Sequence, residues 1–285
     1  MTTVASLITG ATDRIARGGS ASPRLDADVL YRHVAGLDRT ALFLALRDEA
    51  RDDHIARFHD LVDRRIAGQP VAYLIGRREF VGMPFEVTPD VLIPRPETEL
   101  LVEWTLAQLN DLSDTPINVV DVGAGSGAIA VSIVALGPAN TRMLAIEPSQ
   151  RAREVIERNA TELLTDDQRS RFTIADGDLL SDHPGPFGMV LANLPYLTPE
   201  QLAGNADLAA EPRLALDGGA DGLDLVRRLI AQLPGRLTGT CAVGLEIDPS
   251  QFGTVATLLR EAIPDAAVSI IRDLAGHDRH VVAVT

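Results

Sequence analysis

A glycine-rich turn with a suitably spaced acidic residue is the first feature that suggests chemistry. Residues 121–127 read Asp-Val-Gly-Ala-Gly-Ser-Gly, between an apolar segment and a stretch of helical character, and Glu147 ends the next apolar segment. Glycines let the backbone approach a ligand closely, and the first N–H groups of a helix attract anions. A carboxylate at about this distance along the chain can accept hydrogen bonds from a ribose. The pattern therefore predicts a ligand that contains a nucleoside.

Two classes of cofactor fit this turn. With Ala128 as the third small residue, Gly123-x-Gly125-x-x-Ala128 matches the fingerprint of dinucleotide-binding proteins. The alternative is S-adenosyl-L-methionine, whose usual turn is Asp-x-Gly-x-Gly-x-Gly and which matches at both Asp121 and Gly127. In that case we expect the Asp121 carboxylate to stabilise the cationic methionine end of the ligand.

A second motif favours methyl transfer. Asn193-Leu194-Pro195-Tyr196 follows a short apolar segment, and ligands of such folds bind at the strand ends. An amide or exocyclic amine nitrogen is a poor nucleophile because its lone pair is delocalised. The Asn193 side-chain oxygen and the Leu194 carbonyl can each accept one N–H of such a group and orient it, while Tyr196 can stack on it. A dinucleotide-dependent enzyme has no use for this motif.

The order of segments from residue 118 onward predicts how these motifs are held. Seven short apolar segments, each typical of a buried strand, alternate with stretches of helical periodicity. Such alternation indicates β-α-β units and a mostly parallel sheet with helices around it. We therefore predict a Rossmann-like α/β fold whose first βα turn is the glycine-rich one.

The first 97 residues have a different character. Residues 1–70 carry apolar residues at helical spacing, with Ser22-Pro23 and Asp38 as helix starts and Gly68 and Pro70 as stops. Residues 71–97 are rich in β-forming residues, broken by Gly and Pro. We expect three parts, which are a helical bundle over 1–70, a β-hairpin connector over 71–97 and an α/β domain over 98–285.

Composition excludes several classes of function. The chain has 285 residues, a net charge of −14, no lysine and a single cysteine, Cys241. This composition excludes a lysine Schiff base, a P-loop lysine, an internal disulfide and a cysteine zinc cluster. An acidic chain is unsuited to broad contact with a phosphate backbone. We expect no resident metal and no membrane-spanning segment. Because the start of the chain has no export signal, we also expect a cytoplasmic location.

At this point the sequence resembles the release-factor glutamine methyltransferases (the PrmC/HemK family). The resemblance covers nearly the whole chain and includes Gly76-Arg-Arg-Glu-Phe80, Leu92-Ile-Pro-Arg-Pro-Glu-Thr-Glu99, the turn at 121–127, Asn193–Tyr196, and Glu211-Pro212. It implies methyl transfer from S-adenosyl-L-methionine to the side-chain amide of the glutamine in the Gly-Gly-Gln motif of peptide-chain release factors, a modification that bears on translation termination. It also implies that the helical N-terminal domain helps to hold this partner.

The resemblance assigns roles by position. Asn193, Pro195 and Tyr196 are expected to be catalytic, and Asn193 to Tyr196 to bind the glutamine. Phe80, Arg95 and Pro96 are expected near the mouth of the site. The residues expected to bind the cofactor are Asp121, Gly123, Ala124, Gly125, Ser126, Gly127, Glu147, Asp178, Leu179 and Asn193.

The sequence departs from the family pattern at three positions. Leu194 replaces the first proline of Asn-Pro-Pro-Tyr, Glu147 replaces the commoner Asp, and Leu179 stands where a large aromatic residue often covers the adenine. Asn-Leu-Pro-Tyr also occurs in enzymes that methylate adenine N6, so methylation of RNA or DNA is the alternative function. A non-catalytic cofactor-binding module is a third. We expect a monomer with no stable binding of nucleic acid.

Overall fold

The computed structural model describes residues 2–111, 116–205 and 208–285. The chain divides into two compact units, one up to Arg77 and one from Arg78 onward. Each unit has a core of its own, which is consistent with the change in sequence character after the helical segments. No helix of the described residues is long and apolar enough to cross a bilayer.

The first unit is helical, as the sequence predicts. Thr3 and Asp38 cap their helices through side-chain oxygens that accept the N–H groups of Ser6 and Ala41, whereas Ser22 makes no such bond although a helix begins at Pro23. The unit's helices are α1 (Val4–Arg17), α2 (Pro23–Ala35), α3 (Arg39–Ala45), α4 (Asp52–Ile66) and α5 (Val71–Ile75).

The connector segment differs from the prediction at its start. Strands β1 (Arg77–Phe80) and β2 (Met83–Glu86) form a two-stranded sheet, so the expected β-hairpin is present. The expectation of β structure from residue 71 is wrong, because Val71–Ile75 form the short helix α5. Gly76, in the left-handed region at φ 72°, ends this helix, and Leu74 is buried in the core of the first unit. Packing of Leu74 here outweighs the β preference of its neighbours.

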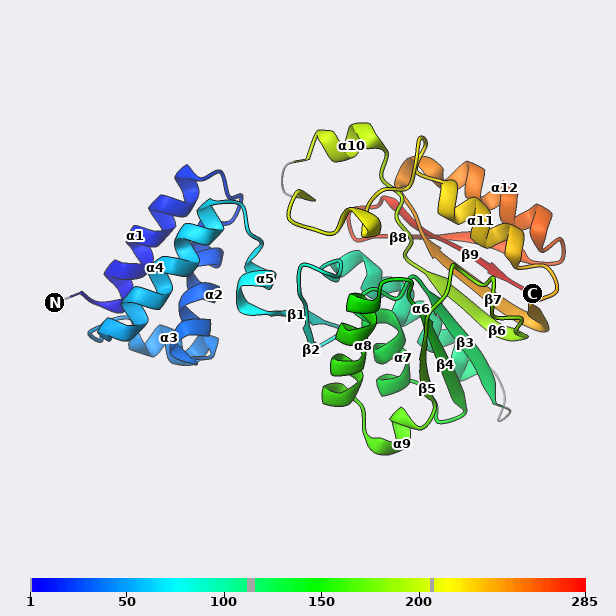
Figure 1. Cartoon of the computed structure of the whole chain (residues 1–285), viewed down its shortest axis with the longest axis horizontal. Helices are drawn as coiled ribbons and strands as arrows, with labels where there is room; N and C mark the ends of the chain where they lie inside the picture. Colours follow the sequence, from blue (N-terminus) through cyan, green and yellow to red (C-terminus); the bar gives the residue numbers. More distant parts are fainter. Residues whose placement is uncertain (1, 112–115, 206–207) are drawn as a thin grey trace. The chain divides into compact units, whose positions relative to one another are not determined.

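The second unit is built on a seven-stranded sheet of order β5-β4-β3-β6-β7-β9-β8 (Figure 1). Neighbouring strands of this sheet are parallel except for the pairs made by β9, which runs antiparallel to β7 and β8. The mostly parallel sheet of the prediction is thus confirmed. The strands are β3 (Ile117–Val122), β4 (Thr141–Ile146), β5 (Phe172–Ala175), β6 (Phe187–Ala192), β7 (Leu237–Glu246), β8 (Ala267–Arg272) and β9 (Asp278–Val284).

Helices cover both faces of the sheet. One core cluster joins strand residues to α6, α7 and α8, and a second joins them to α11 and α12. Figure 1 shows α11 and α12 on one side of the sheet and α6, α7 and α8 on the other. The helical elements of this unit are η1 (Pro96–Thr98), α6 (Glu99–Asp111), α7 (Ala128–Leu136), α8 (Gln150–Leu163), α9 (Asp166–Arg169), α10 (Pro199–Ala203), η3 (Arg213–Ala215), α11 (Asp224–Gln232), η4 (Pro249–Gln251) and α12 (Phe252–Ala262).

The register of three central strands positions the two sequence motifs. Val122 at the end of β3 pairs with Ile146 at the end of β4 and with Ala192 at the end of β6. The sheet order reverses direction at β3, and ligands of open α/β sheets bind outside the carboxyl ends of strands at such a point. The glycine-rich turn, Glu147 and Asn193 therefore follow three neighbouring strand ends.

Candidate active site

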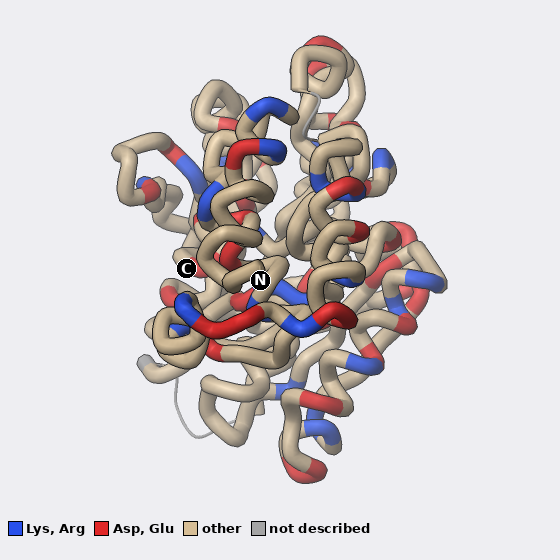
Figure 2. Tube along the Cα trace, turned by 90° about the vertical axis from the view of Figure 1, so that its left-hand side faces the viewer, with Lys and Arg blue, Asp and Glu red and all other residues tan. Residues whose placement is uncertain are grey.

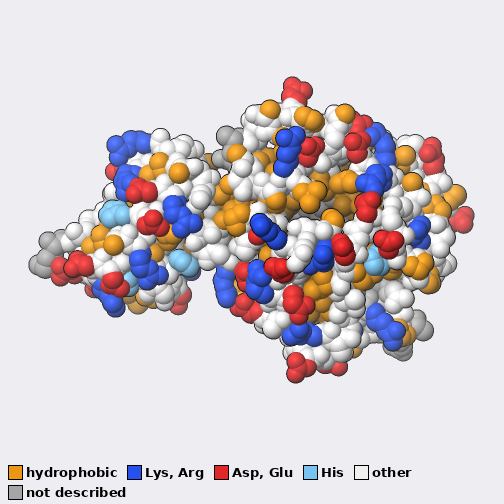
Figure 3. Space-filling view, in the orientation of Figure 1, with side chains coloured by type: hydrophobic (Ala, Val, Ile, Leu, Met, Phe, Trp, Pro, Cys, Tyr) orange, Lys and Arg blue, Asp and Glu red, His pale blue; other side chains and the backbone are white. Residues whose placement is uncertain are grey.

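A cavity of about 470 Å³ lies in the second unit, where these strands end. Its size is within the range of small-molecule sites. Figure 3 shows hydrophobic side chains gathered around a hollow of this unit. The cavity is lined by ten residues that the sequence assigns to the site, Gly123, Ala124, Gly125, Ser126, Glu147, Asp178, Leu179, Asn193, Leu194 and Pro195. Asp121, Gly127 and Tyr196 lie outside this lining.

The glycine-rich turn requires its glycines. Gly123, Gly125 and Gly127 all have positive φ values, of 75°, 57° and 79°, which side chains rarely adopt. A Cβ at Gly123 would lie only 2.9 Å from Leu194 Cδ2, so the turn and the Asn193–Tyr196 segment approach each other closely. Gly127 is the N-cap of α7, and the N–H groups that begin this helix lie beside the cavity wall formed by Ala128 and Ile129.

Glu147 is held by backbone donors at the cavity edge. Its Oε2 accepts the Gly125 N–H at 2.8 Å and its Oε1 accepts the Ser149 N–H at 2.9 Å. Burial raises the pKa of this carboxyl, and the two N–H groups oppose that rise. Two carboxylate oxygens offer about four acceptor positions. Capacity therefore remains for hydroxyl donors from a ligand in the cavity.

Asp121 lies beneath the turn rather than in the cavity wall. The side chain is fully buried, and its Oδ2 accepts the N–H of Ala130 in the first turn of α7 at 3.2 Å. The other oxygen, Oδ1, has no hydrogen-bond partner among the described residues. Burial, with a smaller contribution from nearby Glu147, raises the pKa of Asp121 to about 7. Its role toward the cationic end of a ligand stays a prediction.

Asp178 and Leu179 line the part of the cavity that faces α11. Leu179 is buried with φ 58°, and Leu225 and Arg228 of α11 line the same region. Asp178 Oδ2 accepts a hydrogen bond from Arg228 at 2.5 Å. Arg228 was not among the predicted site residues. Its only sequence signal is a charged position in an amphipathic helix.

Asn193 and its neighbours follow β6 directly. Asn193, Leu194 and Pro195 line the cavity, and Asn193 Nδ2 donates to Thr98 Oγ1 at 3.1 Å. The Tyr196 hydroxyl donates to Glu246 Oε1 at 3.4 Å. Burial and then the Glu246 charge raise the pKa of Tyr196 well above its usual value, so the phenol keeps its proton. The predicted stacking of Tyr196 on a substrate stays a prediction.

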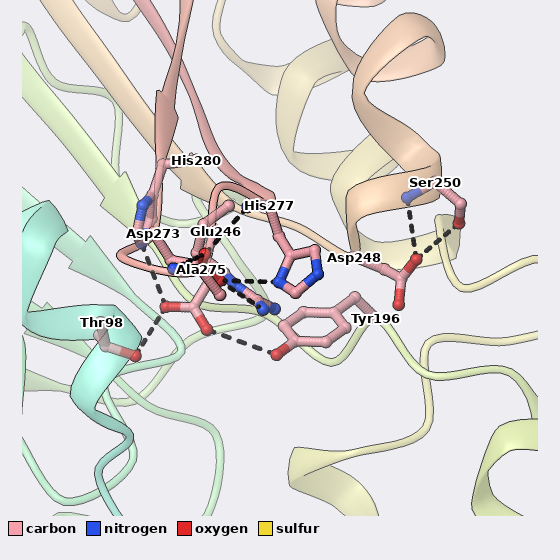
Figure 4. A network of polar contacts seen from close by, with 10 residues as sticks. Thr98, Tyr196, Glu246, Asp248, Ser250, Asp273, Ala275, His277 and His280 are labelled. Atoms are coloured by element: carbon pink, nitrogen blue, oxygen red, sulfur yellow. Dashed lines mark hydrogen bonds and ion pairs between the residues drawn. The ribbon is translucent and has the colours of Figure 1, made fainter.

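A buried polar network behind Asn193 was missed by sequence reasoning. Glu246 ends β7 and accepts hydrogen bonds from Thr98 at 2.6 Å and Tyr196, and His280 of β9 lies 3.3 Å away (Figure 4). The His280 side chain is fully buried where β9 pairs with β7. No cluster of three or more potential metal ligands occurs in the described parts of the chain.

At the cavity, an ion pair and a hydrogen bond connect two segments that are far apart in the sequence. Arg95 lines the cavity and forms an ion pair with the buried Glu211, which also accepts the Ile93 N–H at 3.1 Å. Phe80 does not line the cavity; it is buried and packs edge-on against Phe85, and its expected place near the mouth stays a prediction. Pro96 does not line the cavity, although its neighbour Arg95 does.

The chemistry of this cavity fits S-adenosyl-L-methionine. Three features support the fit: a turn whose glycines leave room for a ligand, a carboxylate with spare acceptors and an apolar wall suited to adenine. The buried Oδ1 of Asp121, which has no hydrogen-bond partner among the described residues, is a further acceptor close to the turn. The fold and the site define the class as an S-adenosyl-L-methionine-dependent methyltransferase with a Rossmann-like sheet.

Comparisons with known proteins narrow this class. Residues 6–76 match the PrmC N-terminal domain, and residues 101–190 match the precorrin methyltransferase domain. The chain is 38% identical to the release factor glutamine methyltransferase of Moorella thermoacetica, covering 96% of this chain and 95% of the relative. It is 36% identical to that of Deinococcus radiodurans, with coverage of 97% and 96%. The chain belongs to the release factor glutamine methyltransferase family.

A solved structure agrees on the fold. A methyltransferase from Pyrococcus furiosus superposes with a TM-score of 0.51 at 15% identity, covering 72% of this chain and 89% of its own. At this level of identity the likeness bears on the fold alone. It matches the α/β architecture derived above from the strand order.

Proposed function

We propose that this protein transfers a methyl group from S-adenosyl-L-methionine to the side-chain amide nitrogen, N5, of the glutamine in the Gly-Gly-Gln motif of peptide-chain release factors. The observation that carries the proposal is the position of Asn193 and Leu194. Both line the cavity directly beside Gly123 of the cofactor turn. Family membership supplies the substrate, and it disfavours the alternative of adenine N6.

The site is suited to a planar amide. When bound, S-adenosyl-L-methionine supplies a methyl group on a cationic sulfur. The Asn193 Oδ1 atom accepts one N–H of the substrate amide, and the Leu194 carbonyl accepts the other. These two acceptors fix the nitrogen in position and stabilise the positive charge that grows on it as the N–C bond forms and the bond between the methyl group and sulfur breaks, which leaves a neutral thioether. The proton that the nitrogen then loses passes to solvent at the open mouth of the cavity.

The cofactor contacts in this proposal come from the residues that surround the glycine turn. Glu147 accepts the ribose hydroxyls, and the backbone from Gly123 to Gly127 passes along the methionine part of the cofactor. Leu179 packs against the adenine, beside Asp178. Asp121 acts from beneath the turn through its charge, because its side chain lies outside the cavity lining.

We also propose roles for the parts of the chain. Residues 1–70 bind the release factor, residues 71–97 connect, and residues 98–285 carry out the transfer. The protein acts in the cytoplasm as a monomer that does not bind nucleic acid stably.

Basic and acidic residues are interspersed in Figure 2 rather than gathered into a basic face, and the net charge is −14. A protein partner suits such a surface better than a phosphate backbone does.

The test offers labelled S-adenosyl-L-methionine together with purified release factor and ribosomal RNA. We expect label on the glutamine of the Gly-Gly-Gln motif, and none on a release factor in which that glutamine is replaced. Asn193→Ala should lower turnover by about 10²- to 10³-fold, the scale for one positioned polar group, with cofactor affinity nearly unchanged. Label in the RNA but not in the release factor would reject the proposal in favour of adenine methylation.

A further inference from the structure

The hydrogen bonds behind Asn193 form a directed chain. Asn193 Nδ2 lies 3.1 Å from Thr98 Oγ1, which lies 2.6 Å from Glu246 Oε2. Thr98 and Glu246 are 4% and 1% exposed, so water does not compete for these bonds. Asn193 follows β6, Thr98 ends η1 and Glu246 ends β7, and Thr98 and Asn193 both line the cavity.

The Glu246 carboxylate determines which groups donate and which accept in this series of hydrogen bonds. Its Oε1 accepts the Tyr196 hydroxyl at 3.4 Å, its Oε2 accepts the Thr98 hydroxyl at 2.6 Å, and His280 Nε2 lies 3.3 Å from Oε2 (Figure 4). An ionised carboxylate only accepts hydrogen bonds, and the hydroxyl of Thr98 has one proton to give. At 2.6 Å this is a short, charge-assisted bond, so the Thr98 proton points to Glu246.

The amide of Asn193 is oriented as a consequence. Because the only proton of Thr98 is committed, its oxygen can act toward Asn193 only as an acceptor. Of the two ends of the Asn193 amide, only the NH₂ end can donate. The NH₂ end therefore faces Thr98, and the Oδ1 end, bonded to the same carbon, is directed away from Thr98.

We infer that Thr98 and Glu246 are positioning residues that keep Asn193 with its acceptor oxygen toward the substrate. The inference rests on the proposed function, because the acceptor is needed for an amide N–H donor. If the amide were rotated by half a turn, its NH₂ would face the NH₂ of the substrate, and two donors cannot form a hydrogen bond. Neither Thr98 nor Glu246 needs to touch the substrate for this role.

The first experiment compares Thr98→Val with Thr98→Ser. Valine keeps the shape of threonine without its hydroxyl, so the amide loses its orientation. We expect kcat to fall by about 10- to 100-fold, the effect of losing one buried hydrogen bond that orients an acceptor. Serine keeps the hydroxyl and should restore kcat to within about threefold. The affinity for S-adenosyl-L-methionine, measured by calorimetry, should change little in both variants.

A matched control and a double variant separate positioning from packing. Thr105 is also fully buried on α6, and its hydroxyl donates to the Leu101 carbonyl within the helix, so Thr105→Val should leave kcat unchanged. On the Asn193→Ala background, Thr98→Val should lower kcat no further, because Thr98 acts only through Asn193. Independent, multiplying losses would overturn the inference.

The outcomes also distinguish this inference from the proposed function. If the wild-type protein does not methylate the release factor, the proposed function fails. If it does so and Thr98→Val matches the wild type in kcat, only the positioning role fails. A Thr98→Val variant with low kcat that serine does not restore, or with equally weakened cofactor binding, would indicate a packing defect and would also overturn the inference.

Discussion

The carboxyl group of Asp121 makes stability depend on pH in a way that one substitution should remove. Its side chain is fully buried with one oxygen bonded to the Ala130 N–H, and burial raises its pKa to about 7 from 3.8. In the unfolded chain the same group titrates near 3.8. In Asp121→Asn the side chain stays neutral at every pH, and its carbonyl oxygen can still accept the Ala130 N–H.

The sign and size of the pH effect on stability follow from the two pKa values of Asp121, in the folded and in the unfolded chain. Below pH 3.8 both states hold the proton, and the contribution of Asp121 to stability is fully present. As the pH rises toward 7, the unfolded chain has lost the proton while the native state still binds it, so the free energy of unfolding falls. A difference of roughly three pH units at about 1.4 kcal/mol each gives a loss of up to about 4 kcal/mol. Above pH 7 the contribution is constant.

The assay is urea denaturation without cofactor at several pH values between 4 and 8. Relative to the wild type, Asp121→Asn should gain stability steadily over this range, by as much as about 4 kcal/mol near pH 8. The exposed Asp182→Asn serves as the control and should follow the wild-type curve. Parallel curves for wild type and Asp121→Asn would refute the reasoning.

Three further substitutions test the cofactor side of the site. Gly123→Ala places a Cβ 2.9 Å from Leu194 Cδ2 at a residue whose φ is 75°. We expect the free energy of unfolding, measured by denaturation, to fall by about 1–3 kcal/mol, and cofactor binding, measured by calorimetry, to weaken. Glu147→Gln turns an acceptor into a donor facing a backbone N–H and should raise the cofactor Kd by about 10- to 100-fold, and an unchanged Kd would contradict the ribose role. Asn159→Ala removes a buried amide that donates to the Ser126 carbonyl at 2.9 Å; unfolding free energy should fall by about 2–4 kcal/mol, and wild-type stability would contradict this bracing role.

Much of the fold could be predicted because its signals are local. Strands such as β6 are continuous apolar runs, and the helices begin at recognisable residues such as Thr3 and Asp38. The reversed direction of β9 has no local signal, since the segment looks like any other buried strand. The helix at Val71–Ile75 was missed because Leu74 is buried by residues of other helices rather than by its sequence neighbours.

The residues of the site likewise fall into those that a local sequence motif reveals and those whose partners are distant in the sequence. Contiguous motifs, such as the glycine turn and Asn193–Tyr196, were visible in the sequence and lie together in the structure. Thr98, Glu246 and Arg228 were not found, because each acts through a partner at least 50 residues away. A usable signal did exist for Glu246, which is a carboxylate at the end of an otherwise apolar strand. Such a residue is costly to bury unless it has partners.

The pairing of β3 with β6 has a consequence for where insertions and deletions can be tolerated in this protein. The ladder places Val122 opposite Ala192, so the donor and acceptor halves of the reaction are spaced by main-chain hydrogen bonds of a rigid sheet. The turns and helices that connect β3 to β6 along the chain do not set the spacing between the ends of these two strands. Insertions and deletions at the far edge of the sheet, around α9 for example, should alter length and surface while leaving the distance over which the methyl group travels unchanged.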